Sequence, residues 1–389
     1  MMESPCVSSP TLIRNNHIIT VSEGKNLVVN FDESGRLLSV TRNGETFRRS
    51  LSGDFYRLGW SGDKRIVEKI SGESSKEVMN SVKSLVSNAV SQCHDTDRPD
   101  LNLIERKTVE METDRNSLLS VYRQMPLIPP GLSRPIYVEL SYGCIWNRCT
   151  ICSSHLERHY EERSLDDFMK HLDNVASYFG QGISSRTGVL LGDANAMNIE
   201  QKTLNLALST IKKKFGLEIQ SSFDIFTTPK KKNMIHFQDM KRNGLDRVNV
   251  YIQSGAYKVL RMLNEHTNAT EILNLVNNMK DSGLGVSLIL LAGTGGKLYR
   301  EDHVEGTANL VSQMLLDAGD TVYISPIVEE EDPSYGDSAA RIGTSPLSND
   351  EKYLQMAEIE KRIKTAYRDI NGTDFPARIV KYDLRECIY

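Results

Sequence analysis

The sequence predicts an α/β protein in which strands and helices alternate around a parallel sheet. From residue 136 onward, short apolar segments alternate with longer amphipathic segments, which is the pattern of parallel β/α architecture. The 389-residue chain is 39% hydrophobic and 25% charged, so it has enough apolar material for a substantial core and is not expected to be disordered. At this length we expect one large domain with extensions, or two domains.

Six strand-like segments predict the strands of this sheet, because they alternate with helix-like segments along the chain. They are residues 136–140, 187–191, 218–226, 247–252, 286–291 and 321–327. Amphipathic segments between them predict the helices, at residues 164–178, 199–214, 234–243, 256–282 (with a break near 266–269) and 302–317. Gly216 follows a run of lysines, which is a typical helix end.

The first 130 residues predict an antiparallel extension. Short alternating segments between Ile18 and Trp60 are separated by turn residues, and Asn43-Gly44 predicts a hairpin because both residue types tolerate a positive φ. We expect a small β-meander here. It is followed by a polar helix at 75–92, a linker rich in Asp and Arg at 95–112, and a short helix at 117–124.

The C-terminal residues predict a cap. Residues 348–370 have the pattern of an amphipathic helix, and residues 377–384 predict a strand that extends or caps the open side of the sheet. The expected domains are therefore the extension at 1–130, the α/β domain at 131–336 and the cap at 337–389.

The sequence gives weaker indications about cellular location and about nucleic acid binding. The N-terminus has no apolar core of signal-peptide type, and the longest apolar stretch, 286–292, is far shorter than the about 20 residues of a membrane span. We therefore expect a cytoplasmic protein. The net charge of −4 gives no reason to expect nucleic acid binding.

Three cysteines give the most specific chemical signal in the chain. Cys144, Cys149 and Cys152 lie within nine residues, directly after the first predicted strand. Three thiolates so close together can bind three corners of a [4Fe–4S] cluster and leave one iron open to another ligand. The remaining cysteines show no ligand spacing; they are Cys6, Cys93 and Cys387.

Two other interpretations of these cysteines compete with the cluster. A disulfide framework requires a short secreted chain, which this is not. Zinc is the stronger alternative, because His155 and His159 follow Cys152 closely. However, zinc fingers separate their cysteine and histidine pairs by about 12–15 residues, whereas only two residues separate Cys152 from His155. A Cys3His zinc site remains open, and the iron–sulfur cluster is favoured.

The run from Tyr142 to Cys152, YGCIWNRCTIC, resembles the cluster loop of radical S-adenosylmethionine (radical SAM) enzymes, in a variant with four residues between the first two cysteines. Its WNRCT segment is similar to a mostly uncharacterised branch related to elongator-type and cobalamin-binding members. Ile151 stands where the family commonly has an aromatic residue, and its side chain still provides an apolar wall. The resemblance covers about residues 134–336. It implies a partial (β/α)6 barrel, with Trp146 and Ile151 beside the cofactors and the chemistry on loops after the strand C-termini.

The same resemblance implies contacts to SAM at the ends of later strands. Gly192, Asp193 and Asn195 occupy the position of the family's motif for the SAM amino group, where an acid suits an ammonium group. Gln253 and Ser254 occupy the position of a Glu-Ser pair near the ribose and methionine portions of SAM. Gln253 carries no charge, which departs from the family pattern.

A glycine-rich turn follows the fifth predicted strand. Its spacing does not fit a phosphate-binding loop, because the chain has Leu291 and Leu298 where that motif requires Gly and Ser or Thr. The resemblance implies that Gly293, Gly295 and Gly296 contact SAM through their backbone, and that Ile327 after the sixth strand forms an apolar wall for adenine. The lysine run at 230–232 is interpreted as a solvated surface.

The implied function is that of an enzyme with two cofactors, a [4Fe–4S] cluster and SAM. Reductive cleavage of SAM would give a 5′-deoxyadenosyl radical that abstracts hydrogen from a small-molecule metabolite, with flavodoxin or ferredoxin as a reductant. Modification of a peptide or a tRNA is the first alternative. A non-enzymatic zinc- or cluster-binding protein is the second. The residues do not identify the substrate, and no second cysteine cluster or cobalamin-type domain is evident.

Overall fold

A computed structural model describes residues 9–61, 64–123, 128–152, 158–224, 232–328, 333–383 and 385. The chain forms two compact units. The first, here the N-terminal unit, comprises Met1–Ile128, His171–Thr187 and Arg385–Tyr389, and the second, the β/α unit, comprises Pro129–Lys170 and Gly188–Leu384. Among the described residues, no helix has the length and apolar character needed to cross a bilayer.

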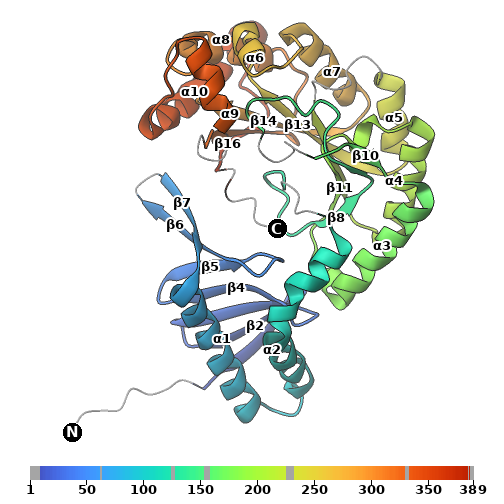
Figure 1. The fold of residues 1–389 in the computed structure, drawn as a ribbon, viewed down its shortest axis with the longest axis vertical. Coiled ribbons are helices and arrows are strands. Elements are labelled where there is room, and N and C mark those ends of the chain that lie inside the picture. The colour runs from blue at the N-terminus through green and yellow to red at the C-terminus, as the bar shows by residue number, and fades with distance from the viewer. Residues whose placement is uncertain are drawn as a thin grey trace. The chain divides into compact units, whose positions relative to one another are not determined.

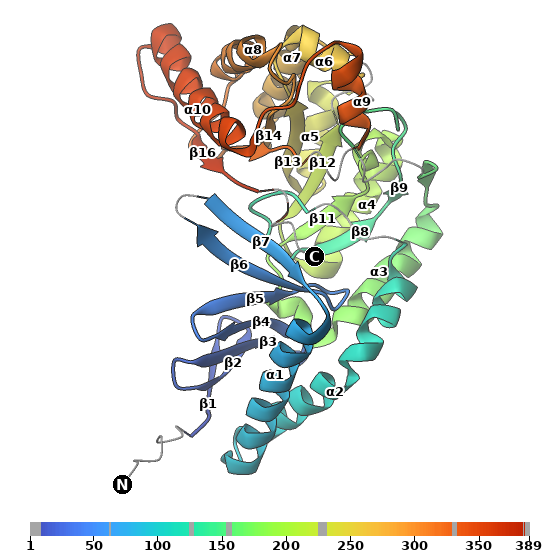
Figure 2. The same ribbon diagram turned by 60° about the vertical axis from the view of Figure 1, so that its left-hand side comes forward.

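The sheet of the N-terminal unit confirms the predicted β-meander and extends it at both ends. Its seven strands pair antiparallel in chain order (Figure 2). Asn43 and Gly44 join two neighbouring strands with φ values of 52° and 85°, as the hairpin signal predicts. The strands are β1 (Thr11–Asn15), β2 (Ile18–Glu23), β3 (Leu27–Asp32), β4 (Leu37–Arg42), β5 (Glu45–Arg49), β6 (Phe55–Ser61) and β7 (Lys64–Ile70).

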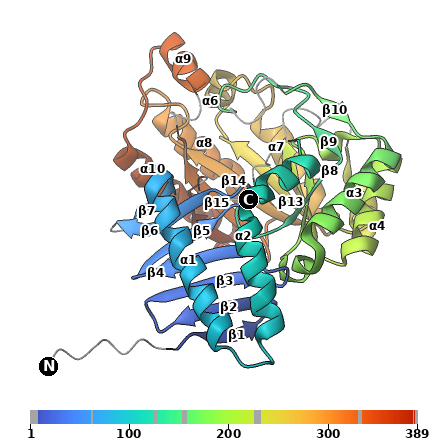
Figure 3. The same ribbon diagram turned by 60° about the horizontal axis from the view of Figure 1, so that its bottom comes forward.

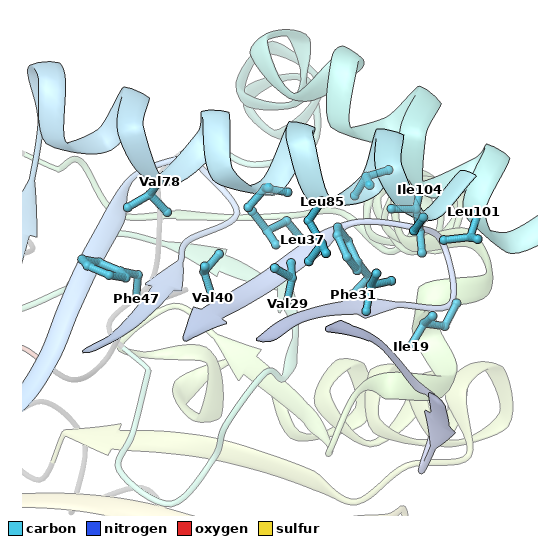
Figure 4. Close-up of a cluster of buried hydrophobic side chains, with 14 of the residues drawn as sticks. Ile19, Val29, Phe31, Leu37, Val40, Phe47, Val78, Leu85, Leu101 and Ile104 are labelled. Carbon is cyan, nitrogen blue, oxygen red and sulfur yellow. The ribbon is translucent and has the colours of Figure 1, made fainter. Parts of the chain in front are cut away.

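Two helices, α1 (Gly72–Gln92) and α2 (Arg98–Val121), lie side by side along this sheet (Figure 3). Figure 4 shows apolar side chains of the strands, such as Phe31 and Val40, facing Val78 and Leu85 of α1. Each of these residues is at most 2% exposed. Full burial of such a side chain contributes about 1.5–3 kcal/mol, so this contact stabilises the unit.

Helix α2 corrects the sequence interpretation, which expected a linker at 95–112. Its sparse apolar residues, Leu101, Ile104 and Leu118, have helical spacing and are at most 1% exposed. Leu101 and Ile104 belong to the core shared with α1 and the sheet. Burial of this narrow stripe therefore outweighs the polar composition of the segment.

The β/α unit contains a seven-stranded parallel sheet, in the order β16-β15-β14-β13-β12-β11-β8. The six predicted strands are confirmed, and the predicted C-terminal strand joins the sheet as β16, parallel to β15. Positions facing each other across three strands, Val250, Leu288 and Val322, are fully buried. The strands are β8 (Ile136–Glu139), β11 (Val189–Gly192), β12 (Ile219–Asp224), β13 (Leu245–Gln253), β14 (Gly285–Ala292), β15 (Thr321–Pro326) and β16 (Arg378–Lys381).

Helices follow the strands and lie along the outer side of the curved sheet (Figure 1). The expected break after β13 occurs between α6 and α7, where the Asn268 side chain caps the second helix. The helices are α3 (Leu165–Phe179), α4 (Gln201–Phe215), α5 (Met234–Arg242), α6 (Tyr257–Met262), α7 (Ala269–Asp281), α8 (Arg300–Ser312), α9 (Pro333–Arg341) and α10 (Asn349–Asn371), with short 3-10 helices at Gly180–Ser185 and Ala196–Asn198. Parallel strands bring all their C-terminal ends to one edge, where the predicted site residues lie.

Candidate functional site

The cysteines lie in a loop whose two ends are held together. We call residues 143–158 the cysteine loop; residues 153–157 lie outside the described part of the chain. The stem is a short antiparallel pair, β9 (Ser141–Tyr142) with β10 (Glu161–Glu162). Gly143 has a φ of 75°, and a Cβ at this position would lie 2.8 Å from the carbonyl oxygen of His159. Only glycine satisfies both the conformation and the close approach.

Two of the three cysteines are buried. Cys144 is 7% exposed and Cys149 is 9% exposed, while Cys152 is half-buried, and all three are thiols. No group of three His, Cys, Asp or Glu side chains within the described ranges is arranged around the position of one metal ion. Three thiols on one short loop, two of them shielded from water, are a donor set that fits an iron–sulfur cluster. His155 of the zinc alternative lies outside the described residues.

The end of strand β11 holds the beginning of the cysteine loop. Oδ2 of Asp193 accepts a hydrogen bond from Gly143 N at 3.1 Å and pairs with Nη1 of Arg158 at 3.2 Å. Oδ1 of Asn195 accepts from Ile145 N at 2.7 Å. Two predicted SAM-binding side chains therefore contact the backbone on both sides of Cys144, and their contact with SAM stays a prediction.

Gly192 directly precedes these residues, and its small size has a packing reason. A Cβ there would lie 2.3 Å from Cε2 of Tyr137. The ring of Tyr137 is 2% exposed, so it has no room to move aside. This contact accounts for the glycine without reference to SAM.

The other side of the cysteine loop docks on the segment after α6. Trp146 donates from Nε1 to the carbonyl of Asn264 at 3.1 Å, and its ring meets that of His266 edge to face, with centroids 5.0 Å apart. Thr150 N donates to the carbonyl of Leu263 at 3.2 Å. The loop is thus held from two sides, by the end of strand β11 and by the segment after helix α6.

Ile151 and Ile327, both predicted to line the cofactor site, are brought together. They belong to one apolar cluster that also contains Leu291 of β14 and Val259 of α6. Ile151 is 9% exposed and Ile327 is 4% exposed. The cysteine loop is therefore connected to the fifth and sixth barrel strands through apolar packing beside Cys152.

Gln253 and Ser254 have different surroundings. Gln253 has a φ of 53°, an unusual conformation for a residue other than glycine. Ser254 is fully buried, and its Oγ lies 2.8 Å from Nδ1 of His303 on α8. Burial lowers the pKa of His303 to about 4, although a backbone hydrogen bond with Leu291 acts in the opposite direction. Ser254 is thus part of an internal polar cluster with an uncharged histidine.

The glycine-rich turn is buried by the chain's own C-terminal helices. The N–H of Gly293 donates to Oε1 of Gln355 at 2.7 Å, and its carbonyl accepts from the hydroxyl of Tyr335 at 2.8 Å. A Cβ on Gly296 would lie 2.6 Å from the carbonyl oxygen of Ser345. All three predicted glycines, including Gly295, have positive φ values and are buried. Their backbone contact with SAM stays a prediction, and the observed contacts already give the glycines a structural reason.

Lys232 corrects the interpretation of the lysine run as a solvated surface; residues 230 and 231 lie outside the described part. The Lys232 side chain is 7% exposed and donates from Nζ to the carbonyl of Ile199 and to Oε1 of Gln201, both at 2.9 Å. Burial lowers the pKa of Lys232 to about 8, against a smaller opposing effect of Glu200. Two carbonyl acceptors, which the sequence run does not reveal, retain this lysine in the interior.

The segment that contains the cysteine loop is similar to a known family. Residues 138–311, from strand β8 to helix α8, match the model of the Radical SAM superfamily. Residues 138–311 of this chain are therefore similar to the radical SAM superfamily, a class of enzymes. Such enzymes use a [4Fe–4S] cluster and SAM, act on a substrate and need a reductant.

Solved structures of several radical SAM enzymes have a related fold at low identity. Coproporphyrinogen III oxidase from Escherichia coli is 14% identical with a TM-score of 0.45, over 64% of this chain and 55% of that one. Methylornithine synthase is 13% identical with a TM-score of 0.43, over 73% of each chain. The chain thus spans about half the length of the oxidase. No curated protein sequence matches it. Likeness at this level carries no inference about substrate.

Proposed function

We propose that Cys144, Cys149 and Cys152 bind a [4Fe–4S] cluster whose fourth iron is available to SAM, and that the enzyme abstracts hydrogen from a small-molecule metabolite. The observation that carries the proposal is the fixed loop of three thiols at the C-terminal edge of the parallel sheet, with two thiols at most 9% exposed. A loop held at both ends can present three sulfur atoms with little loss of conformational entropy on binding.

A [4Fe–4S] cluster held by Cys144, Cys149 and Cys152, together with bound SAM, would supply the radical chemistry that abstracts a hydrogen atom from the substrate. The residues of this chain would position the cofactors and the substrate and would shield them from water. Burial of Cys144 and Cys149 excludes water from the sulfur atoms. Ile151, Leu291 and Ile327 provide an apolar wall beside Cys152. An apolar wall that excludes water is favourable for a reactive intermediate, because it prevents side reactions of the intermediate with water.

A small molecule is favoured over tRNA because the net charge is −4, which is unfavourable for binding a polyanion. Peptide modification is the second candidate, and no observation favours it. We also propose flavodoxin or ferredoxin as the electron donor and a cytoplasmic location. The branch related to elongator-type and cobalamin-binding members stays a proposal as well.

Deuterium transfer tests the substrate class. The reconstituted enzyme is mixed with SAM, dithionite and one of three fractions from cells grown in deuterated medium: small molecules, tRNA or peptides. Mass spectrometry then measures deuterium in the 5′-deoxyadenosine formed. We expect enrichment with the small-molecule fraction alone and none with the Cys149→Ala variant. Enrichment only with tRNA or only with peptides would contradict the small-molecule proposal.

A further inference from the structure

Asp193 has a position that suggests a role other than the one expected for an acid after the second barrel strand. We propose that Asp193 is a positioning residue that, together with Arg158, closes the neck of the cysteine loop, and that it does not anchor the SAM ammonium group. The proposal rests on the proposed function, because it concerns the loop that would hold the cluster. It departs from the role that the family resemblance implies for this residue.

The first support is the geometry of the neck. One carboxylate oxygen, Oδ2 of Asp193, lies 3.1 Å from the amide nitrogen of Gly143 and 3.2 Å from Nη1 of Arg158. These two residues are the first and the last of the cysteine loop. Asp193 is itself fixed, because its N–H donates to the carbonyl of Ser141 in the stem at 3.1 Å. A single side chain therefore connects both ends of the loop to strand β11.

The second support is the matching contact made by Asn195, which lies two residues after Asp193. Its Oδ1 accepts from Ile145 N at 2.7 Å, while Asp193 accepts from Gly143 N. The two acceptors hold the amide groups on either side of Cys144. This pairing restrains the backbone on both sides of Cys144 without any bound cofactor.

The third support is electrostatic. Asp193 and Arg158 are 7% and 9% exposed, so their opposite charges face each other in a buried environment. A buried ion pair is strongly destabilised when one partner is removed, because the other charge is left uncompensated. An ammonium group from SAM would either displace Arg158 or add a second positive charge beside a single carboxylate. Both alternatives are unfavourable. Because Arg158 already compensates its charge, the Asp193 carboxylate is suited to holding the two ends of the cysteine loop together.

The test uses the cluster-free full-length protein, so that loop closure is measured without the cofactors. Alkylation of Cys144 and Cys149 by iodoacetamide is followed by mass spectrometry in the Asp193→Asn and Arg158→Gln variants and in the double variant. Lys170→Gln is the matched control, since its ion pair with Asp167 is exposed. Arg158→Lys tests rescue, because it keeps the charge and one donor. Circular dichroism confirms that each variant is folded.

We expect both single substitutions to accelerate alkylation of Cys144 by tenfold or more. The double variant should react no faster than either single one, because it removes both charges together. Lys170→Gln should match the wild type, and Arg158→Lys should be closer to the wild type than Arg158→Gln. A wild-type alkylation rate in Asp193→Asn or in Arg158→Gln would overturn the proposal.

A second readout separates closure of the loop from SAM binding. In reconstituted Asp193→Asn, we expect a chelator to remove iron at least tenfold faster, while the SAM dissociation constant per remaining cluster changes by less than threefold. Stable iron with SAM binding weakened tenfold would instead assign Asp193 to the ammonium group. Failure of the wild type to bind iron would refute the proposed function and still leave the alkylation comparison to decide the role of Asp193.

Discussion

Substitution of His303 tests whether the buried polar cluster at the end of strand β13 is as dry as the structure indicates. His303 is fully buried, and burial lowers its pKa to about 4 from the usual value near 6.5. Between these two pH values the unfolded chain binds a proton that the folded protein does not. The free energy of unfolding therefore falls as the pH falls from 6.5 towards 4 and loses nothing further from this group below 4.

The magnitude follows from the shift. A difference of about 2.5 pH units at 1.36 kcal/mol per unit gives about 3 kcal/mol in total. Between pH 7 and pH 5 the loss is about 2 kcal/mol, because the folded state is still mostly unprotonated at pH 5. The His303→Gln variant lacks the titrating group but retains a polar side chain near Ser254. Its stability should therefore fall by about 2 kcal/mol less than that of the wild type over this range.

Urea denaturation followed by fluorescence at pH 7, 6 and 5 measures this difference. Carboxylates that titrate near pH 4 cancel in the comparison, since both proteins contain them. His94→Gln is the control, because it replaces a histidine that is exposed rather than buried. An identical pH dependence for the wild type and His303→Gln would refute the reasoning. It would show that water reaches the buried polar cluster around His303.

Three further variants have clear expectations. Gly143→Ala should abolish iron binding, because the new Cβ would lie 2.8 Å from a backbone oxygen at a φ of 75°; iron content after reconstitution measures this. Asp32→Ala should lower the stability of the N-terminal unit by about 3–5 kcal/mol, since it leaves the buried Arg186 without its carboxylate; limited proteolysis and denaturant titration measure this. Replacing Cys93 and Cys387 with Ser should leave the iron content unchanged, because neither residue has ligand spacing.

Two matched variants serve as controls for these substitutions. Gly283 has a φ of 76° with no atom within 4 Å of the position of a Cβ, so Gly283→Ala adds backbone strain without the clash at Gly143 and should retain iron. Asp95 has a fully exposed side chain, so Asp95→Ala should leave the stability of the N-terminal unit unchanged. Iron loss in Gly283→Ala, or wild-type stability in Asp32→Ala, would contradict the corresponding explanation.

The strands and most helices could be predicted from the sequence because their apolar patterns are strong. The segment at 288–292 is a continuous apolar run, and a run of this kind is typical of a strand buried on both faces. Helix α2 was not predicted because its buried stripe is thin: Leu101, Ile104 and Leu118 are distributed over 24 residues of largely polar sequence. Only the core that these residues complete reveals why the segment is helical.

The cysteines could be found from spacing alone, but their supporting residues could not. Arg158 and Asp193 are 35 positions apart, and their ion pair exists because strand β11 lies beside β8 in the sheet. The contact between Gly293 and Gln355 spans 62 positions. No local pattern marks either contact. His303 is similar, since a single histidine in an amphipathic helix gives no indication that it meets Ser254.

The central claim is that three cysteines on one loop hold a [4Fe–4S] cluster with an iron open to SAM. Anaerobic reconstitution followed by iron and sulfide analysis and electron paramagnetic resonance of the reduced protein tests it most directly. The account predicts about four irons and four sulfides per chain, a spectrum that changes when SAM is added, and loss of the cluster in each of Cys144→Ala, Cys149→Ala and Cys152→Ala. Stoichiometric zinc without iron, or a full cluster in any of these three variants, would contradict it.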